Sequence, residues 1–287
     1  MTNTFYTAFL SEKYKLLRNR QIFGVLIAPV LLIFAIDGYI IYDIIRSGSI
    51  SAVPNPWKVL LGRYVFQFFY LLYPILVALF VYACCDVEYK NNNYKVLFTL
   101  PLDKSKIFFS KAVFILLTIL FSILFAYAAF LISGYILGLI YPVLGFQNHD
   151  YRMVIFFTFL KLFITLSAVS MIQLALSLLF KSFIYPIGVS MFMLVFSVFV
   201  AQKSFSDFIP YTGTYKAFMN IMNENDGFER LDYSNIAMII LFMLISFCIF
   251  KRKGPVLTRF FTHFNLQQWS SIFQMTTIVI YFNSILS

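Results

Sequence analysis

Long apolar runs separated by short polar connectors make up most of this 287-residue chain. A helix that crosses a membrane needs about 20 mostly apolar residues. Six runs reach or approach this length, so the pattern predicts an all-α, polytopic integral membrane protein. The six predicted spans are residues 23–45, 64–85, 107–140, 153–180, 183–201 and 236–250.

Two of these predicted spans depart from the usual length. At 1.5 Å per residue, residues 107–140 form a helix of about 51 Å, whereas the hydrocarbon core is about 30 Å thick. We therefore expect this helix to tilt or to protrude into the cytoplasm at residues 107–111. The run at 236–250 is short, but Tyr233 and the basic cluster 251–253 provide an interfacial anchor at each of its ends.

Composition and charge agree with this reading and fix an orientation. The chain is 61% hydrophobic and only 12% charged, whereas a soluble domain has about 25% charged residues. With the N-terminus inside, the cytoplasmic segments hold fourteen basic and four acidic residues, and the external segments hold seven of each. Basic residues favour the cytoplasmic side, so we predict an N-in, C-in topology. This bias accounts for the net charge of +10 without nucleic acid.

The two terminal segments have different patterns. Residues 3–20 place apolar and basic side chains at roughly helical spacing, which predicts an amphipathic interfacial helix; an extended basic flank is the alternative. No cleavable signal peptide is predicted. Residues 1–253 are expected to form the transmembrane domain, and residues 254–287 a C-terminal extension of unknown role.

Two charged residues fall inside predicted spans. Asp37 and Lys161 each lie about eight residues from the outer end of their span, which puts both about 12 Å below the external surface. Charge inside the membrane is costly and usually functional. Equal depth and opposite sign suggest an ion pair or a shared wet cavity, and the alternative is that each side chain snorkels separately to the interface.

Signatures of enzymatic chemistry are absent from the sequence. It contains no GxxxxGK[ST] phosphate loop, no HExxH and no GxSxG motif. The three cysteines form no CxxC pair and the two histidines are isolated, so no metal site, catalytic site or cofactor is predicted. If this protein uses ATP, another chain must bind it.

The polar segment "EYKNNNYKVLFTLPLDKSKIFFSK", residues 88–111, interrupts the apolar pattern between the second and third predicted spans. Pro101 disfavours helix at Leu100, so the segment is expected to form a short helix, a break and the entry to the third span. The short helix carries an apolar stripe that includes Tyr94, Leu97 and Leu100. Such a stripe suits a protein groove or the membrane surface; a solvated connector is the alternative.

This segment resembles the cytoplasmic loop of ABC-2 type ABC transporter permease subunits. Those loops carry an acidic residue, an aliphatic pair, "LP" with a basic residue soon after, and a lysine at the head of the third span. The "NNNYK…TLP" form looks most like the bacteriocin (lantibiotic) immunity and export branch. The specific motif covers about 24 residues, and the six-span layout extends the likeness over residues 1–253.

The resemblance implies a role for each matching residue. Residues 88–101 would be the coupling helix region, in which Glu88 contacts a separate ATPase or caps the helix. Leu97 and Leu100 would fill a cleft on that ATPase. The other residues placed at this interface are Tyr94, Pro101, Lys104 and Lys106. Residues 91–93 are Asn where the family often has Gly, which leaves the backbone geometry there open.

The resemblance also implies an assembly and a location. The chain would be the non-enzymatic permease of an ATP-driven exporter in a bacterial cell (inner) membrane, and ATP and Mg would bind the partner ATPase. A second permease copy or paralogue would complete the path for an amphipathic or hydrophobic compound such as an antimicrobial peptide. An ATP-independent secondary transporter and a non-transporting scaffold or sensor are the alternatives.

Overall fold

The computed structural model describes residues 9–11, 14, 20–47, 55–89, 103–180, 182–222 and 227–252. The regular elements in these ranges are helices, and no strand occurs among them. The prediction of an all-α membrane protein is therefore confirmed. Five of the described helices are long and apolar enough to cross a membrane: Gly24–Arg46, Phe69–Glu88, Lys104–Ile140, Arg152–Leu179 and Arg230–Arg252.

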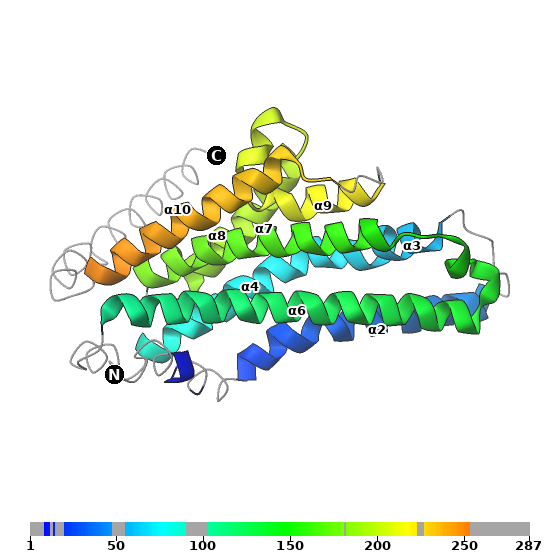
Figure 1. Cartoon of the computed structure of the whole chain (residues 1–287), viewed down its shortest axis with the longest axis horizontal. Coiled ribbons are helices and arrows are strands. Elements are labelled where there is room, and N and C mark those ends of the chain that lie inside the picture. The colour runs from blue at the N-terminus through cyan, green and yellow to red at the C-terminus, as the bar shows by residue number, and fades with distance from the viewer. Residues whose placement is uncertain are drawn as a thin grey trace, which may run out of the picture.

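The helices follow one another along the chain and form one bundle (Figure 1). The longer helices are α2 (Arg20–Ser47), α4 (Phe66–Tyr89), α6 (Lys104–Ile140), α7 (Arg152–Leu179), α8 (Ile184–Val200), α9 (Thr212–Met222) and α10 (Arg230–Arg252). The shorter ones are α3 (Pro56–Val59), the π-helix η1 (Leu60–Val65) and the 3₁₀ turns η3 (Pro142–Leu144), η4 (Phe146–Asn148) and η5 (Ser204–Phe208).

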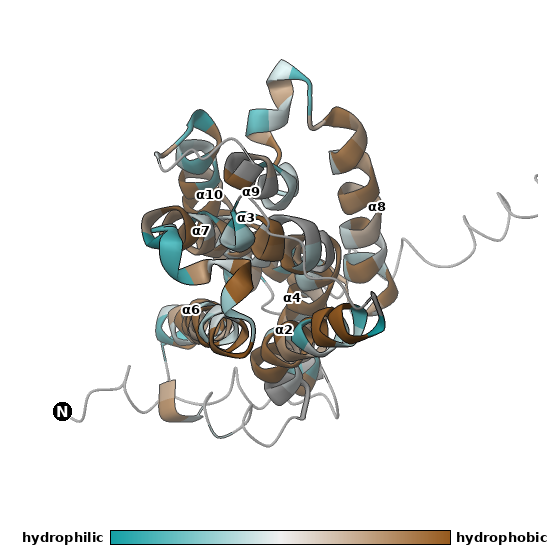
Figure 2. Ribbon diagram, turned by 90° about the vertical axis from the view of Figure 1, so that its right-hand side faces the viewer, coloured by the Kyte–Doolittle hydropathy of each residue, from teal (hydrophilic) through white to brown (hydrophobic). Residues whose placement is uncertain are grey.

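Two predicted spans need correction. The run at 183–201 forms α8, which has only 17 residues and is about 26 Å long, so a sixth full-length span is not established; α8 lies at the edge of the bundle (Figure 2). The predicted span 236–250 is shorter than the helix that contains it, because α10 begins at Arg230 and ends at Arg252. Asp232 and Asn235 are buried in its first turns, and these polar residues concealed the start of the helix.

Helix α7 is the centre of the bundle. It packs against α4, α6, α9 and α10. In its apolar 18-residue stretch 72% is buried, whereas the corresponding share in α2 is 22%. Its polar side chains therefore meet protein rather than lipid. Gln173, for example, donates a hydrogen bond to the hydroxyl of Tyr211 at 2.5 Å, and burial raises the pKa of that phenol.

Helices α2 and α6 run parallel in a fixed register. Ser122 donates to the carbonyl of Val25 at 2.7 Å, and Ser133 donates to Asp37 at 2.6 Å. The partners are 97 and 96 residues apart in the chain, so Arg20, the first residue of α2, lies level with about residue 117. Residues 104–116 of α6 consequently extend past the start of α2 by about 20 Å, as Figure 1 illustrates.

The GxxxG spacing of α6 is filled from within the chain. A Cβ atom on Gly134 would lie 2.2 Å from the indole of Trp57, and one on Gly138 would lie 3.2 Å from Phe146. Trp57 also donates from Nε1 to the carbonyl of Phe146 at 2.9 Å. These glycines thus allow α3 and η4 to close onto α6.

Candidate functional site

The predicted coupling segment is attached to two helices that project beyond α2. We refer to residues 81–89 of α4 and 104–116 of α6 as the stem. Tyr73 of α4 contacts Ser122 of α6, and Glu88 contacts Lys111, so the two helices of the stem run antiparallel. Residues 90–102, which connect them, lie outside the described residues.

A buried ion pair joins the two helices of the stem. Lys111 Nζ lies 2.5 Å from Glu88 Oε1, and the side chains are 1% and 10% exposed. Lys111 also donates to the carbonyl of Cys84 at 3.0 Å, so its charge faces both a carboxylate and the negative end of α4. The resemblance implies that Glu88 contacts the ATPase or caps the helix; in the structure its carboxylate lies inside the bundle beside Lys111.

Helix α6 starts at a well-defined cap. The side chain of Asp103 accepts a hydrogen bond from the backbone N–H of Ser105 at 3.0 Å, which satisfies one of the donors that every helix start leaves free. Lys104 is half-buried and Lys106 is exposed. Helix α6 therefore begins directly after Asp103. Tyr94, Leu97, Leu100 and Pro101 lie outside the described residues.

Aromatic rings of α10 and of the N-terminal segment pack against the stem. Phe108 lies 5.5 Å from Phe247 and 5.8 Å from Phe250 of α10, measured between ring centroids. Phe114 lies 6.3 Å from Phe9 in the same measure. Residues 9–11 and 14 are the only described part of the predicted interfacial helix before Arg20, and they are helical. The described part of the N-terminal segment therefore contacts the stem at Phe114.

The two intramembrane charges have separate partners. Asp37 of α2 accepts a hydrogen bond from Ser133 of α6. Lys161 of α7 lies 3.9 Å from Asp232 and 4.0 Å from Glu229, at the start of α10. The structure therefore does not bring Asp37 and Lys161 together, and each instead joins two neighbouring helices.

Two residues that form buried ion pairs, Lys111 with Glu88 and Asp232 with Lys161, are not among the site residues predicted from the sequence. Lys111 is the one charged residue inside the predicted span 107–140, so the rule that flagged Asp37 would have flagged it too. Asp232 lies outside the predicted span 236–250, although it belongs to the first turn of α10. The side chain of Asp232 is 3% exposed.

Metal chemistry finds no support in the part of the chain that the structure describes, where no three His, Cys, Asp or Glu side chains gather. The site residues are charged and aromatic groups at helix ends, which suits packing and docking.

Neither the curated proteins nor the solved structures contain a match to this chain. One family model matches residues 8–197, and its description is "ABC-2 family transporter protein".

Proposed function

Since the chain belongs to the ABC-2 family of transporter proteins, we propose that it is the permease subunit of an ATP-driven exporter and that a separate ABC ATPase docks on the tip of its stem. Membership makes the chain a membrane component of an ABC transporter. The ATPase, its docking site and the cargo are the proposed part. The cargo we propose is an amphipathic or hydrophobic compound, with an antimicrobial peptide as the first candidate.

The observation that carries this proposal is the stem itself. It extends past the start of α2 by about 20 Å, and the headgroup layer of one leaflet is about 5–8 Å thick. Helix α10 ends beside the stem, since Phe250 lies 5.8 Å from Phe108, so only about four residues, or about 6 Å, of α6 extend past that contact. With residues 251–253 as the predicted interfacial anchor, the tip of the stem lies at the outer edge of the headgroup layer on the predicted cytoplasmic side. Residues 90–102 would then be presented to a protein in the cytoplasm.

The buried pair of Glu88 and Lys111 supports the same proposal. A docking segment transmits force only if its two ends cannot separate from the helices behind it. The ion pair connects the last turn of α4 to the second turn of α6, on either side of the segment. Movement imposed on residues 90–102 would therefore reach both helices together.

The experiment is coexpression of the tagged chain with its neighbouring ABC ATPase, followed by copurification. In the variant Leu97→Asp/Leu100→Asp, charge replaces the apolar stripe, and we expect at least a tenfold loss of bound ATPase. A matched control is Val143→Asp, since Val143 is 61% exposed in the turn η3 after the far end of α6. If the double variant retains the ATPase as well as the control does, the docking site is wrong.

A further inference from the structure

The two prolines inside α2 and α4 each leave a backbone carbonyl without its helical donor. Proline has no N–H, so the carbonyl four residues earlier loses its partner. For Pro29 this is the carbonyl of Val25, and for Pro74 it is that of Tyr70. Hydrocarbon offers no substitute donor, so such a carbonyl must be satisfied from a neighbouring helix.

At Pro29 the substitute comes from α6. Ser122 donates to the carbonyl of Val25 at 2.7 Å, and its Oγ lies 2.5 Å from the hydroxyl of Tyr73 on α4. Because the proton of Ser122 is committed to Val25, the hydroxyl of Tyr73 must be the donor in the second bond. Val25, Tyr73 and Ser122 are at most 3% exposed, so three helices meet in a buried hydrogen-bonded chain.

At Pro74 the same chemistry occurs in a looser form. Thr214 of α9 directs its hydroxyl at the carbonyl of Tyr70 over 3.4 Å and at that of Tyr211 over 3.2 Å. Its single proton is shared between the two acceptors. The carbonyl that Pro74 frees in α4 is therefore bonded to α9 more weakly than the carbonyl that Pro29 frees in α2 is bonded to α6.

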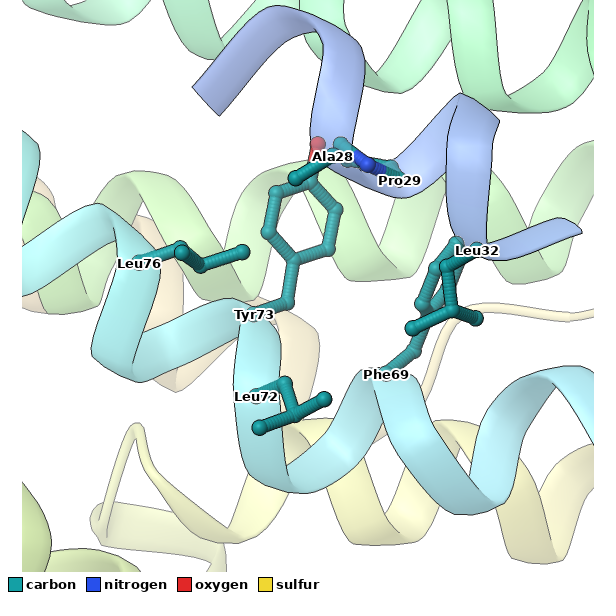
Figure 3. A pocket seen from close by; sticks show the side chains of 7 residues that line it. All are labelled: Ala28, Pro29, Leu32, Phe69, Leu72, Tyr73 and Leu76. Carbon is teal, nitrogen blue, oxygen red and sulfur yellow. The ribbon is translucent and has the colours of Figure 1, made fainter. Parts of the chain in front are cut away.

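A groove lies beside the tighter of these contacts. It has a volume of about 260 Å³ and is lined by apolar side chains of α2 and α4, among them Leu32 and Leu76. Figure 3 shows the ring of Tyr73 pointing from α4 toward Ala28 and Pro29. Tyr73 lines the groove and belongs to the hydrogen-bonded chain, and Pro29, which frees the carbonyl of Val25, lines the groove as well.

We propose that Ser122 and Tyr73 form a latch that holds the turn of α2 before Pro29 against α4 and α6. With the latch closed, α2 and α4 keep one separation along the groove. With the hydroxyl removed, the carbonyl of Val25 has no donor, and α2 can straighten or swing away from α4. The latch goes beyond the proposed function, since it would operate whatever the ATPase or cargo is.

A double-mutant cycle on the full-length chain tests the latch. Ser122→Ala is expected to lower the apparent Tm in detergent by about 2–4 °C. In Pro29→Ala, residue 29 regains an N–H that can bond Val25, so adding Ser122→Ala removes only the acceptor of Tyr73 and should lower the Tm by at least about 1 °C less than it does with Pro29 in place. Equal shifts in the two backgrounds would overturn the proposal.

A second measurement covers the case in which Pro29→Ala does not fold. Tyr73→Phe removes only the outer hydroxyl and leaves Ser122 bound to Val25, so its effect should be smaller than that of Ser122→Ala. Spin labels at the exposed positions Ile27 and Leu79, in a Cys248→Ser background, report the separation of α2 and α4. Ser122→Ala should broaden the distance distribution more than Tyr73→Phe does. An unchanged distribution in Ser122→Ala would show that no latch exists.

Discussion

The buried pair of Glu88 and Lys111 makes a quantitative prediction about stability. The two charges are 2.5 Å apart, and at an effective dielectric constant of about 20 their attraction is about 7 kcal/mol. Most of this gain offsets the cost of removing both groups from water. Removing one partner leaves the other charge buried and unpaired, which costs about 3–5 kcal/mol.

Three variants separate these contributions: Glu88→Met, Lys111→Met and the double change. Lys111→Met should be the most damaging, because it leaves a carboxylate among apolar side chains. Glu88→Met should cost less, since the ammonium group keeps the carbonyl of Cys84 as an acceptor at 3.0 Å. The double variant should be close to the wild type, because two apolar side chains of similar volume replace the pair.

The assay is thermal unfolding of the purified full-length chain in one detergent at one scan rate, because membrane proteins seldom unfold reversibly. A loss of 3 kcal/mol or more lowers the apparent Tm by at least about 6 °C. Lys106→Met is the matched control, since Lys106 is an exposed lysine on the same helix, and it should shift the Tm by about 1 °C or less. If the two single losses simply add in the double variant, the pair does not stabilise the stem.

Two further predictions concern the half of the bundle away from the stem. Gly134→Ala should destabilise the chain by about 1–3 kcal/mol, because its Cβ would lie 2.2 Å from the indole of Trp57. Gly188→Ala is the control and should not destabilise the chain, because no atom lies within 4 Å of its Cβ. Equal Tm values for the two variants would contradict this packing. Lys161→Met and Asp232→Asn should be non-additive in a thermal-shift double-mutant cycle, with a coupling of about 0.5–3 kcal/mol. A coupling of zero would mean that their 3.9 Å separation contributes nothing.

The long helices could be predicted because their signal is local. The solvent for most of their surface is lipid, so hydropathy alone marks α2, α4, α6 and α7 to within a few residues. The start of α10 could not be found in this way, since Asp232 and Asn235 are polar and become compatible with a buried helix only through partners on α7. Hydropathy along the sequence contains no information about tertiary partners of that kind.

In the candidate site, too, local features could be predicted from the sequence and tertiary partners could not. The segment at 88–111 was identified from its polarity and its likeness to a family, and the family is confirmed over residues 8–197. The inward direction of Glu88 could not be predicted, because it depends on Lys111 approaching from a helix that runs antiparallel. Likewise, the partner of Asp37 is a serine, and serines in a membrane helix are too common to single one out.

The central claim is that the tip of the stem binds an ABC ATPase. The most direct measurement places the photoreactive residue benzoylphenylalanine at Leu97 of the full-length chain, coexpressed with the neighbouring ATPase, and a second sample carries it at Val143. Irradiation should give a covalent adduct with the ATPase from position 97 and none from position 143. An adduct from position 143 alone, or from neither position while the ATPase copurifies, would contradict the account.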